Sequence, residues 1–178
     1  MRTIFTRSGL FRQFDHKLFH SRLQHITRDW VPVCALVIGA AVLFQQHFMF
    51  GVNASPSLPI NLFLIHKGTT LMQGQYVAFR WPGGGPHPAG TIFVKLIAGM
   101  PGDVVTRIDR DFFINGTHVG RGKPFSRQGV PLEPGPTGTL AAGHYYVRAP
   151  HPDSLDSRYR LTGWVTQSQI IGRAYALF

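Results

Sequence analysis

Residues 91–97, with the sequence TIFVKLI, form the stretch on which the predicted fold is built. Side chains in such a stretch alternate between two faces in the two-residue period of a β-strand. One face carries Phe93, Lys95 and Ile97, so that a lysine stands between two large apolar residues. The pattern predicts a strand with Lys95 in an apolar setting that none of the other three lysines shares.

Short strand patterns continue on both sides of this stretch, separated by glycine and proline. The other expected strands lie at 62–65, 76–81, 104–108, 112–114, 117–119, 145–148 and 170–177. Asn115-Gly116 predicts a two-residue hairpin turn between two of them, whereas 82–86 and 131–138 predict loops. The sequence therefore predicts an all-β domain of short twisted antiparallel sheets over residues 51–178, without a helix of any length.

The composition argues against several classes of function. The chain of 178 residues has a net charge of +10 and eight carboxylates, which disfavours a hydrolase that uses paired carboxylates. The single cysteine, Cys34, leaves no intramolecular disulfide and no cysteine-based zinc site. Metal-binding, P-loop and dinucleotide motifs are missing from the sequence, so we expect no cofactor and no metal. The positive charge forms no dense run with interleaved aromatics, so we expect no nucleic-acid partner.

The first 50 residues predict a membrane anchor. Residues 1–29 carry six basic and two acidic side chains, with apolar residues at near-helical spacing. This pattern is typical of a basic amphipathic helix at a membrane surface, and also of a charged flank that orients the next segment. Residues 30–50 contain no formal charge and are long enough to span a bilayer, with Pro32 expected in the first helical turn. A cleavable signal peptide is the alternative, but its apolar region is shorter.

The distribution of basic residues predicts the orientation of this anchor. Six basic residues precede the apolar segment, and Lys67 is the first one after it. By the positive-inside rule the N-terminus lies in the cytoplasm. We therefore expect a single-pass protein of the bacterial inner membrane, with residues 51–178 in the periplasm and the lipid bilayer as a partner.

Residues 53–59, with the sequence NASPSLP, directly follow the anchor. Ser55 and Ser57 stand two residues apart, and each is followed within two positions by a proline, which stiffens the backbone. A nucleophilic serine needs such a backbone, because it must meet a substrate carbonyl in one geometry. A Ser/Pro-rich linker is the alternative.

Lys95 offers a general base for such a serine. An amine desolvated between apolar residues has a lowered pKa, so that near neutral pH it is uncharged and can accept a proton. The alternative is an edge-strand or snorkelling lysine. A histidine triad is a further alternative. However, His66, His118, His144 and His151 lie beside turn residues or at expected surface positions.

Several stretches of this sequence, and their order along the chain, resemble those of the type I signal peptidases, a family of serine/lysine peptidases. Residues 55–59 (SPSLP) are similar to the family's nucleophile box, and residues 93–103 (FVKLIAGMPGD) to its general-base box. Residues 154–159 (SLDSRY) and 170–174 (IIGRA) are similar to its C-terminal box and closing strand. The resemblance implies the family's all-β fold after one transmembrane helix.

The sequence departs from the usual pattern of the family at three places. Leu58 abuts Pro59, whereas ordinary signal peptidases keep one residue between these positions. Residues 148–153 replace an expected Gly-Asp-Asn run, and residues 160–162 are additional. The compact Ser-Leu-Pro and the small domain resemble the conjugative-transfer branch, whose members process pilin precursors and in some systems join the pilin ends into a ring.

The resemblance also implies residue roles, with Ser57 as the nucleophile and Lys95 as the general base. The implied oxyanion or supporting residues are Ser55, Ser154, Asp156 and Arg158. The Ser55 hydroxyl and the Ser57 N–H would stabilise the oxyanion, and Ser154 would hold the Lys95 amine. Asp156 and Arg158 would form a supporting ion pair. The alternative for residues 154–158 is a solvated turn.

The predicted function is that of a membrane-anchored serine endopeptidase that removes signal, leader or terminal peptides from exported precursors. A conjugative pilin, either left linear or cyclised, is the favoured substrate, and other signal-bearing precursors are expected partners. A housekeeping type I leader peptidase of broad range is one alternative. A non-catalytic membrane-anchored component of a pilus or secretion assembly is an alternative of another class.

Overall fold

The computed structural model describes residues 16–53 and 57–177. The chain divides into two compact units, with the boundary in the sequence between Leu43 and Phe44. The first unit contains most of helix α1 (His16–His47). The second contains the end of that helix and the strands. The N-terminal segment that we expected to be helical is helical from His16 onward, and residues 1–15 lie outside the described part.

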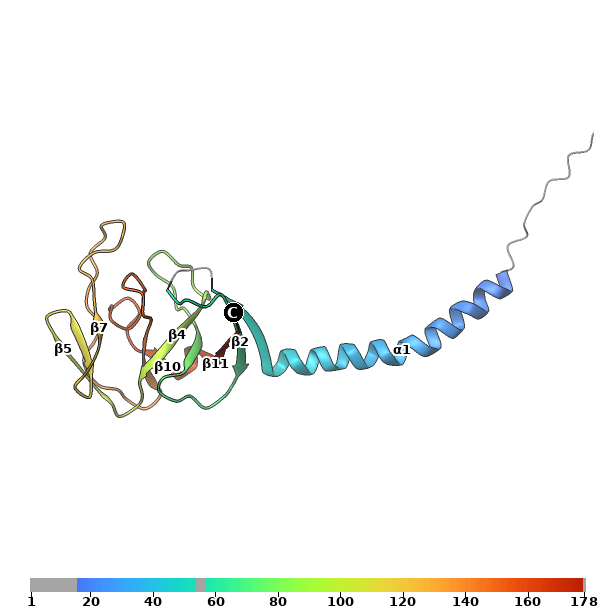
Figure 1. The fold of residues 1–178 in the computed structure, drawn as a ribbon, viewed down its shortest axis with the longest axis horizontal. Coiled ribbons are helices and arrows are strands. Elements are labelled where there is room, and N and C mark those ends of the chain that lie inside the picture. The colour runs from blue at the N-terminus through green and yellow to red at the C-terminus, as the bar shows by residue number, and fades with distance from the viewer. Residues whose placement is uncertain (1–15, 54–56, 178) are drawn as a thin grey trace, which may run out of the picture. The chain divides into compact units, whose positions relative to one another are not determined.

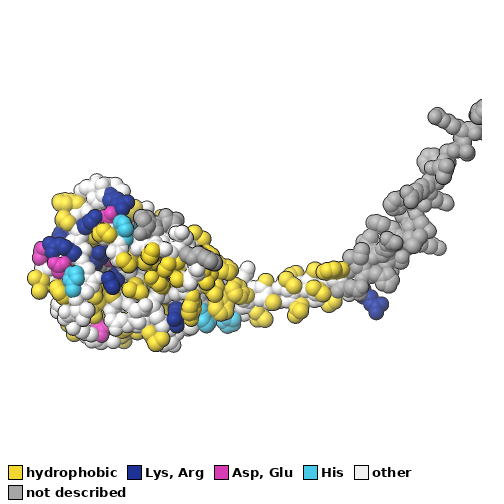
Figure 2. All heavy atoms as spheres, viewed as in Figure 1, with side chains coloured by type: hydrophobic (Ala, Val, Ile, Leu, Met, Phe, Trp, Pro, Cys, Tyr) yellow, Lys and Arg dark blue, Asp and Glu magenta, His cyan; other side chains and the backbone are white. Residues whose placement is uncertain are grey.

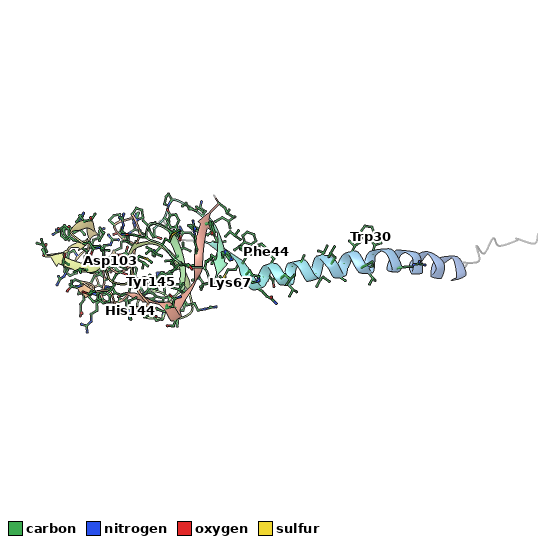
Figure 3. All side chains as sticks on the ribbon, turned by 90° about the horizontal axis from the view of Figure 1, so that it is seen from below. Trp30, Phe44, Lys67, Asp103, His144 and Tyr145 are labelled. Atoms are coloured by element: carbon green, nitrogen blue, oxygen red, sulfur yellow. The ribbon has the colours of Figure 1, made fainter. Side chains whose placement is uncertain are left out.

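Helix α1 contains the apolar stretch. Its segment Trp30–His47 has a mean hydropathy of 1.5 and is, by length and composition, able to cross a membrane. Hydrophobic side chains cover this segment in Figure 2, and they project outward from Trp30 onward in Figure 3. Pro32 lies inside the helix instead of in a first turn, because α1 is already helical before Trp30. The helix ends at His47, so residues 48–50, which we expected at the end of the span, belong to the first strand.

The second unit is built from two antiparallel sheets (Figure 1). The larger sheet has the strand order β1-β2-β11-β3-β4-β9-β10, and the smaller has the order β7-β6-β5-β8. The strands are β1 (Phe48–Val52), β2 (Leu62–Lys67), β3 (Tyr76–Arg80), β4 (Ile92–Gly99), β5 (Val104–Ile108), β6 (Asp111–Ile114), β7 (Thr117–Arg121), β8 (Gly138–Thr139), β9 (His144–Arg148), β10 (Val165–Thr166) and β11 (Ile170–Ala176), with the short 3-10 helix η1 (Gln167–Gln169) before β11. The predicted all-β class is confirmed.

The eight expected strands correspond to strands in the structure, with small shifts at their ends. Asn115 and Gly116 both have positive φ and join β6 to β7, as a two-residue hairpin turn of type I′ requires. Strands β1, β8 and β10 were not predicted. The apolar run of β1 does not alternate and adjoins the apolar helix, and two-residue strands carry no periodic signal.

Strand β4 connects the three clusters of the hydrophobic core. It pairs with β3 on one side and β9 on the other, so it lies in the interior of the larger sheet. Ile97 belongs to the cluster around Trp81, and Ala98 to the cluster around Tyr146 under the smaller sheet. Val94 packs against a third cluster that includes Leu58. A side chain on β4 is therefore fixed by packing on several sides.

Gly172 allows β11 to fit between β2 and β3. It pairs with Lys67 in β2 and with Ala78 in β3. A Cβ added at Gly172 would lie 1.9 Å from the carbonyl oxygen of His66 and 2.8 Å from the Cα of Lys67. Because both are backbone atoms of a paired strand, neither can move aside without opening the sheet.

Gly172→Ala should therefore destabilise the protein by about 3 kcal/mol or prevent folding, in the range of overpacked cores. The measurement is the thermal unfolding midpoint of the full chain in detergent. Gly122→Ala is the matched control, because its added Cβ would meet its nearest neighbours at an ordinary 3.6 Å. Equal midpoints for the two variants would contradict the close approach at Gly172.

Candidate active site

Lys95 lies on β4 opposite Val77 of β3, inside the larger sheet. Its exposed fraction is 5%, and its Nζ lies 5.6 Å from the centroid of the Phe93 ring. The edge-strand alternative is excluded, because β4 has a partner on each side. The snorkelling alternative is excluded by the burial of the side chain.

Burial lowers the pKa of the Lys95 amine from its ordinary value of 10.5 to about 8. The low polarity of the surroundings disfavours the charged form and is the largest effect. The negative charge of Asp156 opposes it, and the positive charge of Arg158 adds to it. A substantial fraction of the amine is therefore uncharged at mildly alkaline pH.

The Lys95 amine is held by the turn that follows β9. Its Nζ donates a hydrogen bond of 2.8 Å to Ser154 Oγ, and this serine is 3% exposed. The backbone N–H of Ser154 donates to the carbonyl of His151, which closes the turn. The hydrogen bond gives the amine a fixed direction inside the sheet.

A buried ion pair supports this turn. Asp156 is 0% exposed and accepts two hydrogen bonds of 2.8 Å from Arg158, through Nε and Nη2. Asp156 also accepts from the backbone N–H of Ala149 at 3.0 Å. Arg158 donates further to the carbonyls of Arg121, His151 and Ser154. The solvated-turn alternative for residues 154–158 is therefore excluded.

The segment around Ser57 is folded into the domain. Ser57 is 8% exposed, and Leu58 is 3% exposed within a core cluster. The Asn53 side chain donates to the carbonyls of Leu58 and Ile60 at 3.2 and 3.0 Å. The Asn53 N–H donates to Asn61, which closes the loop from the other side. A plain linker would not have this burial; Ser55 lies outside the described residues.

Ser57, Lys95 and Ser154 line one cleft of about 470 Å³. The three side chains come from the loop before β2, from β4 and from the turn after β9. Asp156 and Arg158 are not among the lining residues; Arg158 donates to the carbonyl of Ser154, and both charges influence the pKa of Lys95. The cleft thus combines a hydroxyl with a buried amine of lowered pKa, which are the groups required for nucleophilic catalysis with a lysine base.

The histidines give no comparable arrangement. Within the described residues His118 contacts Asp111 at 3.1 Å, but both lie on the β6–β7 hairpin and neither lines the cleft. His151 does line the cleft. Within the same residues, no group of three or more His, Cys, Asp and Glu side chains is placed to hold a metal ion.

Several residues of the site were not predicted from the sequence. Asn53 was quoted only as the start of the NASPSLP stretch, although its side chain fixes the Ser57 loop. His87, Lys123, Arg127 and Asp153 line the cleft from loops. Loops carry no periodic pattern, and only the departure of residues 148–153 from the family pattern could have directed attention to Asp153.

Comparison with known proteins places the chain in a family. The family described as signal peptidase, peptidase S26, matches residues 23–178. The structure is also similar to the crystal structure of a signal peptidase I from Enterococcus faecalis V583, with 24% sequence identity, a TM-score of 0.41, and coverage of 62% of this chain and 98% of that one. A search of curated proteins found no significant match.

The chain therefore belongs to the signal peptidase family, peptidase S26, because the match spans most of its length. Members of this family are serine endopeptidases that remove signal peptides. The protein is therefore a serine peptidase of the kind that removes signal peptides.

Lys95→Met should stabilise the fold at pH 7 by about 2 kcal/mol, after allowance for the lost hydrogen bond to Ser154. At pH 7 the folded protein must protonate a buried amine whose pKa is about 8, whereas the unfolded chain binds the same proton with an ordinary pKa. The wild type therefore gains stability as the pH rises from about 8 to 10.5, and the advantage of the variant should shrink over this interval. Unfolding midpoints at several pH values measure the difference.

Lys67→Met is the control, because the Lys67 amine makes an exposed hydrogen bond to the carbonyl of Gln45 instead of a buried one. It should give no stabilisation. A Lys95→Met protein that is less stable than wild type at pH 7 would contradict the desolvation of this amine.

Proposed function

We propose that this protein is a membrane-anchored serine endopeptidase in which Ser57 is the nucleophile and Lys95 the general base. The observation that carries the proposal is the buried Lys95 amine, which is directed by Ser154 and lines the same cleft as Ser57. A buried lysine without a charged partner at hydrogen-bond distance weakens the fold, and such groups gather at functional sites. The family match supports the same assignment.

In the first half of the reaction, neutral Lys95 takes the proton of the Ser57 hydroxyl. Ser57 Oγ then attacks the scissile carbonyl and forms a tetrahedral oxyanion. The backbone N–H of Ser57 and the hydroxyl of Ser55 stabilise this oxyanion. Collapse of the intermediate breaks the peptide bond, and the protonated Lys95 gives its proton to the leaving amine.

In the second half, the acyl group on Ser57 is transferred to an acceptor. Lys95 takes a proton from water as the water oxygen attacks the acyl carbon. The acyl bond to Ser57 Oγ then breaks, the protonated Lys95 returns its proton to Ser57 Oγ, and the carboxylic acid product leaves. If an amine of the same substrate attacks in place of water, a new peptide bond closes a ring. Asp156 and Arg158 support both halves by holding the turn that carries Ser154.

The substrate reaches this cleft at a membrane. Trp30–His47 serves as the single transmembrane anchor, with the basic N-terminal residues in the cytoplasm and the β-sheet unit in the periplasm. Residues 48–56 join the end of α1 to Ser57, and this tether limits how far the nucleophile can lie from the membrane surface. A precursor that is still tethered by its own apolar segment would present its cleavage site at this depth.

The favoured substrate is a conjugative pilin precursor, and a broad-range leader peptidase is the alternative. The direct Leu58-Pro59 junction and the small domain favour the pilin-processing assignment. Leu58 is buried in the core next to Ser57, so this junction adjoins the proposed nucleophile. The product is expected to be a trimmed pilin, either linear or cyclic.

Ser57→Ala and Lys95→Ala should each abolish processing of a co-expressed pilin precursor. The first removes the attacking oxygen and the second the base, so losses of several orders of magnitude are expected, as in other nucleophile–base pairs. Intact mass spectrometry of the pilin separates unprocessed, cleaved linear and cleaved cyclic products. Processing by Lys95→Ala would exclude the dyad, and processing by both variants would favour a non-catalytic assembly component.

Ser55→Ala should slow cleavage by about a hundredfold without abolishing it. Loss of one oxyanion donor typically raises the barrier by about 3 kcal/mol, and the Ser57 N–H remains. The measurement is kcat/KM on a precursor peptide, with Ser168→Ala as a control because this serine lies in η1 and does not line the cleft. A near-normal rate for Ser55→Ala would remove Ser55 from the site.

A further inference from the structure

One wall of the cleft carries charged side chains that the proposed reaction does not use. Lys123 and Arg127 line this wall, and Asp153 lies between them. Apart from Lys95, these three are the residues with formal charge among the described residues that line the cleft. Val52, Ile92 and Val94 contribute an apolar, uncharged lining to the same cleft.

The three charges form a cluster with one positive charge in excess. Lys123 Nζ donates to one carboxylate oxygen of Asp153, and Arg127 Nε donates to the other at 2.8 Å. These two hydrogen bonds, the one from Lys123 foremost, lower the pKa of Asp153 to about 2. The carboxylate therefore stays ionised at all ordinary pH values and neutralises one of its two cations.

Arg127 retains hydrogen-bonding capacity toward the cleft. A guanidinium group has five N–H donors in a fork that fits a carboxylate. Within the described chain, Arg127 uses only Nε, for Asp153, and its side chain is 60% exposed. The Lys123 side chain is 44% exposed, whereas Asp153 is 21% exposed. An incoming carboxylate thus meets the two cations before it meets the internal anion.

The backbone that carries these cations is fixed before any ligand arrives. Arg110 Nη1 donates to the carbonyls of Lys123 and Leu132 at 2.8 and 3.1 Å, which closes the base of the 123–132 loop. The Lys123 N–H donates to the hydroxyl of Tyr159, itself a cleft residue. Within the loop, Ser126 and Val130 are paired through their backbones. The charges are therefore positioned, which reduces the entropy lost on binding.

We propose that Lys123 and Arg127 make this cleft selective for precursor segments that carry an aspartate or glutamate in the stretch that occupies it. An extended segment on the apolar lining would direct one side chain toward the cation pair, where its carboxylate would bind the free N–H groups of Arg127 and share Lys123 with Asp153. The inference deepens the proposed peptidase function and rests on it. It assigns specificity to residues of the same cleft that take no part in the proposed reaction.

The experiment measures kcat/KM of the full chain in detergent on short internally quenched peptides. The parent peptide has an Ala-Gln-Ala cleavage site and uncharged flanks, in line with the small-residue sites of exported precursors. Glutamine is placed at each flanking position in turn and compared with glutamate at the same position. At one or two adjacent positions, glutamate should be preferred roughly fivefold, the range of partly exposed ion pairs. This preference should fall as salt is added.

Two variants test which residues cause the preference. In Lys123→Gln/Arg127→Gln the glutamate-to-glutamine ratio should fall to about one, and in Arg127→Glu a lysine-bearing peptide should become better than its glutamate counterpart. Arg107→Gln is the matched control, since Arg107 is an exposed cation on β5 that does not line the cleft. It should keep the wild-type ratio.

The failure of this inference differs from the failure of the proposed function. A wild-type enzyme that cleaves the parent peptide with no preference for glutamate overturns the inference and leaves the peptidase intact. The same holds for a preference that survives in the double variant. If the folded wild-type protein cleaves none of the peptides and is as inactive as the Ser57→Ala variant, the proposed function and the inference are both overturned.

Discussion

The structure depends on one constraint, the burial of an amine in the interior of a β-sheet. Lys95 is 5% exposed on a strand with partners on both sides, and its Nζ meets Ser154 Oγ at 2.8 Å. Burial lowers its pKa, and the serine gives it a direction. The Asp156–Arg158 pair in turn fixes the serine. The sheet, the turn after β9 and the ion pair thus all help to position the hydrogen bond between Lys95 and Ser154.

The buried amine lowers the stability of the fold, although its lowered pKa is what the proposed reaction requires. A buried amine weakens the fold at neutral pH, and a buried ion pair stabilises only if its hydrogen bonds are complete. The Asp156–Arg158 pair meets that condition, because Arg158 also bonds to three backbone carbonyls. Strand β4 packs against all three core clusters, so the surrounding sheet compensates for the unfavourable lysine. A functional site of this kind needs a rigid scaffold around it.

The sequence predicts the fold class and eight strands, because period-two alternation and the Asn-Gly turn are local signals. It also indicates Lys95, whose apolar neighbours two residues away lie on the same face. Strand β1 was hidden in an apolar run beside the helix. The sequence also did not predict the cluster of Lys123, Arg127 and Asp153, because these residues meet only through long-range contacts between loops. An apolar run without alternation and contacts between distant loops both leave no periodic pattern within a short window of sequence.

The most direct test of the account is the pKa of the Lys95 amine in the intact protein. The chain has four lysines, so nitrogen-15 labelling of lysine gives a spectrum simple enough to titrate by NMR in detergent. One amine should titrate near 8 and disappear from the spectrum of Lys95→Met. A spectrum in which no amine titrates near 8 would contradict the lowered pKa of the buried Lys95 amine and with it the mechanism built on this base.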